Sequence, residues 1–181
     1  MKKCFLIPAS ILVLHAAGLA QDFTVVVKAH HFSPSDRVFR AIYGGGWTYG
    51  AEATIRPWKN IGFWLGGHLY TKKGELSFTR EETKLEIFPI GGGLKYMTTS
   101  GRTDFYAGLG VGYFHFNEIN PIGNVDKAHV GALAKIGTMI RLQEAIVLDI
   151  FLDYTYCRLK PADTPINIGG FLTGAGLGIE F

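Results

Sequence analysis

Cysteine is nearly absent from this chain of 181 residues, which contains only Cys4 and Cys157. Cys4 lies in an N-terminal segment that we expect to be removed, so Cys157 would remain alone and no disulfide framework is available. Charged residues are also scarce, at 18%, against the roughly 25% usual for soluble domains. The basic residues are scattered singly, without a patch interleaved with aromatics, and this distribution excludes a nucleic-acid-binding surface.

Long apolar runs are missing as well, except at residues 5–20. That run follows two lysines and ends in small residues, which is typical of a secretory signal peptide. We therefore predict a signal peptide over residues 1–20, cleaved before Gln21. The alternative is an uncleaved anchor helix, but the run is short for a span and is interrupted by Pro8.

Glycine, by contrast, is abundant, with 24 residues, and its placement at residues 166–181 is regular. Counting back from Phe181, every second residue is mostly bulky and apolar, while the residues between them are mostly glycine. A period of two predicts a strand. A helix is excluded, because each glycine would cost about 1 kcal/mol relative to Ala in a helix interior.

The glycine-rich face indicates which way this strand points. A water-facing strand normally carries polar side chains, and glycine is depleted there because it contributes no packing. On the inner wall of a narrow barrel, glycine instead leaves room for long side chains from other strands. We therefore predict that the apolar face contacts lipid.

The same alternation recurs along the rest of the chain. We expect eight strands, at residues 23–32, 43–56, 61–71, 83–97, 103–116, 126–141, 146–158 and 166–181. Short turns alternate with longer polar loops, which include residues 33–42, 72–82 and 117–125. This arrangement predicts an all-β fold over residues 21–181: a closed antiparallel up-and-down eight-stranded transmembrane β-barrel, with both termini at the short-turn rim.

One predicted strand, residues 83–97, does not keep a single phase. Leu85 and Ile87 share one parity, whereas Leu94 and Tyr96 require the other. Proline cannot donate to the ladder and is often found at bulges. We therefore predict a bulge at Pro89 that resets the alternation.

Aromatic residues near the predicted strand ends would form two interfacial girdles. The expected periplasmic set is Phe23, Tyr96, Phe105 and Phe181, and the expected outer set is Tyr43, Trp47, Tyr113, Tyr156 and Phe171.

The charged residues with inward parity form the best-defined candidate site. Five are basic and five are acidic: Lys28, Arg56, Lys95, Lys135 and Arg141, and Glu52, Asp104, Asp149, Asp153 and Glu180. The hairpins predict Lys95 nearly opposite Asp104 and Lys135 diagonal to Asp149. Eight strands leave an interior only wide enough for side chains, so we predict a structural ion-pair network and no continuous channel.

Three histidines, His30, His68 and His129, also have inward parity, toward the outer half of the barrel. They lie on separate strands without the spacing of a ligand motif, so we predict no metal site. No cofactor is expected.

The chain resembles the small outer-membrane β-barrel proteins of Gram-negative bacteria, which include the OmpA transmembrane domain, OmpX and OmpW. The resemblance is carried by the predicted signal peptide, the eight alternating segments, the glycine-rich segment 106–113 and the terminal Phe181. It implies integral outer-membrane localisation with periplasmic termini, lipids as partners, and a monomer. It also implies insertion by the barrel-assembly machinery, which would recognise Phe181, Ile179 and Leu177.

The expected function is structural or surface-interaction, with the longer loops carrying any specificity. The resemblance to OmpW implies an alternative, the passage of small apolar solutes through a lateral opening near Pro89. A second alternative is an enzyme acting on lipid A, because one such barrel uses a His and a Ser two residues apart. Here Asn117 follows His115 and Gly131 follows His129 at that spacing, so neither His has a hydroxyl to activate, and we predict no catalysis.

Overall fold

The computed structural model describes residues 22–75, 82–120, 123–160 and 165–181. The predicted signal peptide, residues 1–20, lies outside these ranges. The elements are β1 (Asp22–Pro34), α2 (Arg37–Tyr43), β2 (Gly46–Trp58), β3 (Ile61–Glu75), β4 (Glu82–Ser100), β5 (Thr103–Asn120), β6 (Gly123–Arg141), β7 (Ile146–Tyr156), β8 (Arg158–Leu159), β9 (Ile166–Asn167) and β10 (Gly170–Glu180). In the described part of the chain, no helix is long and apolar enough to cross a membrane.

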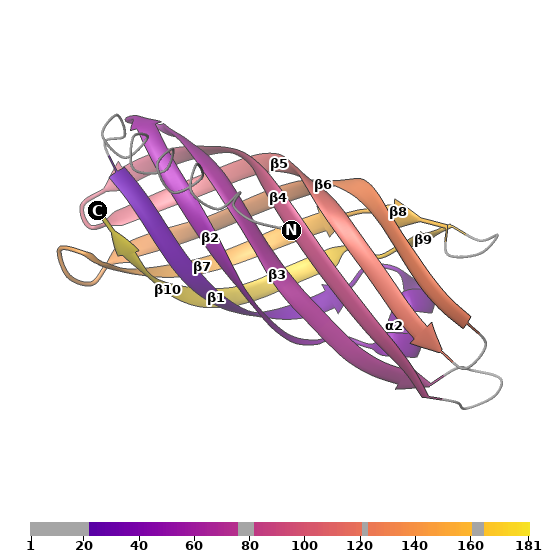
Figure 1. Cartoon of the computed structure of the whole chain (residues 1–181). Coiled ribbons are helices and arrows are strands. Elements are labelled where there is room, and N and C mark those ends of the chain that lie inside the picture. Colours follow the sequence, from indigo (N-terminus) through magenta and orange to yellow (C-terminus); the bar gives the residue numbers. More distant parts are fainter. Residues whose placement is uncertain (1–21, 76–81, 121–122, 161–164) are drawn as a thin grey trace, which may run out of the picture.

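Eight of these strands close into an antiparallel barrel in the order β1-β10-β7-β6-β5-β4-β3-β2 (Figure 1). The first and last strands join along their length, from Thr24↔Glu180 to Pro34↔Gly170. At the short-turn rim, Phe23 and Phe181 exchange backbone hydrogen bonds of 3.2 and 2.8 Å. The predicted fold class is therefore confirmed, and β8 and β9 form a separate two-stranded ribbon.

The inward glycines make room for large side chains from neighbouring or more distant strands. A β-carbon added at Gly110 on β5 would lie 2.6 Å from a ring carbon of Trp64 on β3. One added at Gly137 on β6 would lie 2.5 Å from the hydroxyl of Tyr106 on β5. Trp64 and Tyr106 are both buried. Glycine on the inner wall thus leaves room for these large side chains.

Four neighbouring strands, β3 to β6, are longer than predicted and continue beyond β7 and β10 (Figure 1). The hairpin of β3 and β4 stays paired up to Glu75↔Glu82, and that of β5 and β6 up to Asn120↔Gly123. Of the predicted loops at 72–82 and 117–125, residues 72–75, 82, 117–120 and 123–125 are therefore strand, and the remaining residues lie outside the described ranges. The polar residues of these strand segments were interpreted as loop, but a strand outside the membrane can carry a polar outer face.

The two faces of β4 exchange character partway along the strand. Near the short turn, Leu94 points outward and Lys95 is buried. Near the other end, Lys84 points outward with half of its side chain exposed, whereas Leu85 and Ile87 are buried. The strand is thus apolar outside and polar inside at one end, and the reverse at the other.

This exchange replaces the predicted bulge at Pro89, which is absent. The pairing of β4 with β5 runs without a shift from Lys84↔Ile119 to Ser100↔Thr103. The side chains keep one phase throughout, and what changes is the surrounding solvent. Lipid requires apolar outward residues, whereas water beyond the membrane permits polar ones and lets the apolar ones form a core.

The inner faces of the longer strands, together with α2 and parts of β1, β8 and β10, contribute to an apolar core, which we call the outer core. It consists of Phe32, Phe39, Tyr43, Tyr70, Leu85, Ile87, Phe114, Phe116, Cys157, Leu159, Ile168 and Leu172, all buried. Tyr43 was predicted in the outward girdle, but it closes α2 and packs on Phe39 with ring centroids 5.1 Å apart. The predicted polar loop 33–42 is thus largely a helix that contributes two rings to this core.

Asp36 caps α2 and connects it to the last loop. Its Oδ1 accepts hydrogen bonds from the backbone N–H groups of Val38 (2.8 Å) and Phe39 (3.1 Å), and its Oδ2 accepts one from the N–H of Asn167 (3.2 Å). Burial alone would raise the pKa of the Asp36 carboxyl, but these hydrogen bonds outweigh it and hold the pKa below its usual value. The ionised carboxylate suits a helix N-terminus.

Candidate functional site

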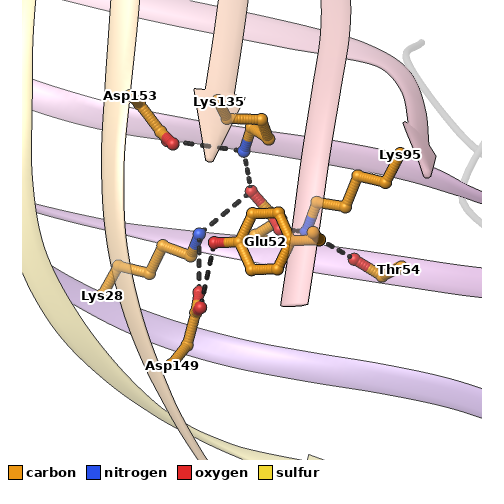
Figure 2. Close-up of polar contacts among 8 residues, drawn as sticks. Lys28, Glu52, Thr54, Lys95, Lys135, Asp149 and Asp153 are labelled. Carbon is orange, nitrogen blue, oxygen red and sulfur yellow. Dashed lines mark hydrogen bonds and ion pairs between the residues drawn. The ribbon is translucent and has the colours of Figure 1, made fainter. Parts of the chain in front are cut away.

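The lumen contains an inner ion-pair cluster centred on Glu52 of β2. The carboxylate of Glu52 pairs with Lys28 (3.1 Å), Lys95 and Lys135, which come from β1, β4 and β6 (Figure 2). Lys28 also pairs with Asp149 at 2.9 Å, and Lys135 with Asp153 at 3.4 Å. We refer to these six residues, Lys28, Glu52, Lys95, Lys135, Asp149 and Asp153, as the inner cluster.

Each lysine of the inner cluster also lies over an aromatic ring. The Nζ atoms of Lys28, Lys95 and Lys135 are 4.2, 4.4 and 3.9 Å from the ring centroids of Phe151, Tyr106 and Trp64. These rings were not among the predicted site residues, although their inward parity, with Trp64 between Gly62 and Gly66, was a usable signal. Three ammonium groups meet three carboxylates, so the cluster is neutral, as a buried charged site requires.

A second set, the rim cluster, lies nearer the short turns and consists of Arg56, Asp104, Arg141 and Glu180. Arg141 contacts Asp104 at 2.7 Å and Glu180 at 2.8 Å, and Arg56 contacts Asp104 at 3.4 Å. Two guanidinium groups here balance two carboxylates. The ten predicted residues therefore divide into two separate neutral clusters.

The predicted hairpin pairs are wrong. Asp104 lies opposite Thr99 and Lys95 opposite Gly108, so these two charges do not pair. Lys135 lies opposite Asp153, and Asp149 pairs with Lys28 and accepts a hydrogen bond from the Tyr106 hydroxyl at 2.9 Å. Five of the eight ion pairs of the two clusters join strands that are not neighbours in the barrel, and hairpin register alone does not specify them.

A small cavity of about 50 Å³ adjoins the inner cluster and is lined in part by His30, His68, Trp64 and Asp153. The rings of His30 and His68 meet edge to face with centroids 5.1 Å apart. Both ring nitrogens of His30 and the indole nitrogen of Trp64 are buried without a partner in the protein. This volume suits a few water molecules.

His129, predicted to point into the lumen with the other two histidines, is exposed. His129 lies on the part of β6 that extends beyond β7, since the pairing of β6 with β7 ends at Ala132↔Tyr156. Among the described residues, no group of three or more His, Cys, Asp or Glu side chains is arranged to hold a metal ion.

The wall beside the cavity is locally weakened. The ladder between β3 and β4 is interrupted between Gly67↔Ile90 and Tyr70↔Ile87, where Pro89 has no N–H to donate. An outward groove of about 340 Å³ lies against this wall. Ala51, Glu52, Gly66 and Gly67 line both this groove and the inner cavity.

His115, considered above for catalysis, contacts a carboxylate. Its Nε2 lies 2.9 Å from Oδ1 of Asp126, and both side chains are well exposed. A nucleophilic mechanism would require a hydroxyl or thiol next to this imidazole, and the residue two positions along is Asn117.

Much of the barrel's outer surface is apolar. Seven of the nine predicted girdle residues are exposed, from 43% for Tyr156 to 73% for Phe181, whereas Phe23 is half-buried and Tyr43 lies in the outer core. The strands between the two rims expose Leu65, Leu109, Val111, Ile136 and Leu177. Soluble monomers rarely expose an apolar surface that extends around the molecule. This band is what a barrel embedded in lipid presents.

The fold is that of the small eight-stranded outer-membrane β-barrels. The crystal structure of Neisserial surface protein A (NspA) matches with a TM-score of 0.69 and 16% identity, over 88% of this chain and 97% of that one. OprG from Pseudomonas aeruginosa matches with a TM-score of 0.74 and 15% identity, over 90% and 96%. Ail, the attachment invasion locus protein of Yersinia pestis, matches with a TM-score of 0.56 and 12% identity, over 88% and 98%.

Ail has also been solved in complex with the heparin analogue sucrose octasulfate. No family model and no curated protein matches this chain in sequence. At these identities, the likeness extends to the fold alone.

Proposed function

We propose that this protein is an integral outer-membrane barrel with a structural and surface-interaction role and without catalysis. The single observation that carries the proposal is the change of polarity along β3 to β6. These strands rise out of the lipid-facing band into a projection with a polar outer face and its own buried core. A projection folded in this way offers a rigid surface to a partner outside the cell.

The filled lumen supports the same proposal. The rim cluster, the inner cluster and the outer core follow one another along the barrel axis, leaving a cavity of about 50 Å³. We further propose that residues 1–20 are cleaved, that both termini face the periplasm, and that the barrel is monomeric. The assembly machinery would read Phe181, Ile179 and Leu177, whose side chains are exposed on the outer face of the barrel at its C-terminus.

The experiment is binding by intact cells that display the protein, using immobilised matrix and serum proteins as probes. A charge-reversed pair on the projection, Lys84→Glu with Lys127→Glu, should reduce adhesion. The matched pair at the short-turn rim, Lys59→Glu with Arg102→Glu, should leave adhesion unchanged. Equal adhesion by both pairs and by cells without the protein would contradict a surface-interaction role.

A second candidate function is the lateral passage of small apolar solutes, favoured by the interrupted ladder at Pro89 with a cavity and a groove on its two sides. Ala51→Trp would fill the groove and should abolish solute uptake in this case. Ala107→Trp, on the lipid face of β5, is the control and should not affect uptake. Identical uptake by the two variants and by cells lacking the protein would exclude this function.

A further inference from the structure

A cleft of about 640 Å³ separates the outer part of β6 from the β8 segment. It exists because β6 is paired with β7 only as far as Ala132, so residues 124–131 have β5 on one side and no β7 on the other. We call it the basic cleft, and its lining residues are Lys127, Ala128, His129, Arg158, Leu159, Lys160 and Pro165.

The charge of this lining has one sign. Lys127, Arg158 and Lys160 are exposed cations, His129 is a fourth basic side chain, and none of the lining residues that the structure describes is acidic. The nearest carboxylate on β6, Asp126, contacts His115 of β5. The Lys127 ammonium donates to the carbonyl oxygen of Lys160 and so bridges the two sides of the cleft. An anionic group therefore matches the cleft better than any other ligand class.

The height of the cleft identifies the source of that anion. On the outward face of β7 and β8, the girdle residue Tyr156 is followed two positions later by Arg158. On β6, the lipid-facing Val130 is followed outward by Ala128 and then by the charged Asp126. The edge of the hydrocarbon thus falls near Tyr156 and Val130, and the cations lie just outside it, at the level of lipid headgroups.

We propose that the basic cleft binds the phosphate groups of an anionic glycolipid in the outer leaflet of the surrounding membrane. Arg158 and Lys160 approach the phosphates from β8 and its following residue, and Lys127 and His129 approach them from β6. The inference depends on the barrel spanning the membrane, but it does not depend on an extracellular protein partner. It would hold even if the adhesion experiment above gave no signal.

The test is a titration of the purified, detergent-solubilised barrel with bisphosphorylated lipid A, followed by native mass spectrometry. Arg158→Gln with Lys160→Gln removes two cations from the cleft and should weaken binding about thirtyfold. The control pair, Lys59→Gln with Arg102→Gln, removes the same charge from exposed positions at the opposite rim. It should change the affinity less than about twofold, and the affinity of the native chain should fall as salt rises.

Three further arms separate the possible ligands. Lipid A stripped of its phosphates should bind at least about tenfold more weakly than the intact lipid, because the apolar band alone would hold it. Equal binding of the two lipids, or equal affinity of the cleft and control variants, would overturn the proposal. Binding of sucrose octasulfate or of an acidic peptide, without phosphate-dependent lipid binding, would also overturn it and assign the cleft to a soluble polyanion or a protein.

Discussion

Glu52 is the residue on which the charge balance of the lumen depends most. Its single carboxylate contacts three ammonium groups, and its side chain is 4% exposed. Removing one partner of a buried ion pair costs more than the pair contributes, because the remaining charges stay buried. We expect Glu52→Gln to lower the free energy of unfolding by about 3 kcal/mol or more, measured by urea titration of the refolded barrel in detergent.

The matched control for this change is Glu86→Gln, which also neutralises one glutamate in a pair with lysine. The Glu86 and Lys84 side chains are 39% and 50% exposed. Exposed pairs contribute at most about 1 kcal/mol, so this variant should unfold almost as the native chain does. Equal stability of the two variants would show that the inner cluster contributes nothing beyond a surface ion pair.

At the residue scale, the sequence predicts which face a side chain occupies but not which partner it contacts. A period of two is a local property, so it placed Glu52, Lys95 and Asp104 on the inner face without any knowledge of the barrel. Which charges meet depends on how the strands are staggered around the whole circumference. Lys95 therefore contacts Glu52, two strands away, and not Asp104 on the neighbouring strand.

At the scale of the element, β5 is the clearest example of a strand in two solvents. Leu109 and Ile119 both point outward from it, but Leu109 lies in the lipid-facing band and Ile119 near the tip of the projection. Leu109→Arg should destabilise the barrel by about 2 to 4 kcal/mol, and Ile119→Arg by at most about 1 kcal/mol. Refolding into lipid vesicles, followed by denaturant titration, measures both. A similar cost at the two positions would place the tip of β5 inside the membrane.

The helix α2 is held by a chain of hydrogen bonds that also reaches the outer core. Asp36 accepts from the N–H of Asn167, and the side-chain oxygen of Asn167 accepts from the N–H of Cys157 at 3.0 Å. Cys157 is a buried free thiol. Losing a helix N-cap typically costs about 1 kcal/mol, so Asp36→Ala should make local opening about fivefold more frequent.

The thiol provides the measurement. A membrane-impermeant maleimide added to intact cells should label Cys157 slowly in the native chain and about fivefold faster in Asp36→Ala. The control, Asp126→Ala, removes an aspartate that contacts His115 on the outer face, and should label at the native rate. If Asp36→Ala also labels at the native rate, α2 does not protect the outer core.

Two errors of prediction belong to this scale and have physical causes. The phase of residues 83–97 was interpreted as a bulge, because the prediction assumed lipid along the entire strand. The helix was missed because seven residues give little periodicity, although Asp36 followed by apolar residues at 39 and 43 is a recognisable start signal. In both cases the sequence contained the information, but only the phase error came from wrongly assumed surroundings.

At the scale of the whole molecule, the barrel combines three layers that block its axis for different reasons. The rim and inner clusters are each neutral, so neither presents a net charge that would attract ions of one sign. The outer core excludes ions because they would lose their hydration. The layers follow from the stagger of the strands. When the paired residues are followed from Tyr156 of β7 through each neighbouring strand in turn, the path returns to β7 at Ile146, ten residues from its start.

This layering predicts the electrical behaviour of the protein. Eight strands leave space for side chains and little else, and both kinds of layer must open before ions can cross. In planar bilayers, the native chain should therefore give no steady conductance steps. Phe114→Ala with Leu85→Ala, which truncates the outer core alone, should also remain closed, because the two charged clusters persist beneath it. Steady steps from the truncated variant alone would show that the apolar layer is the only seal, and steps from the native chain would show that the paired charges leave a continuous path for water.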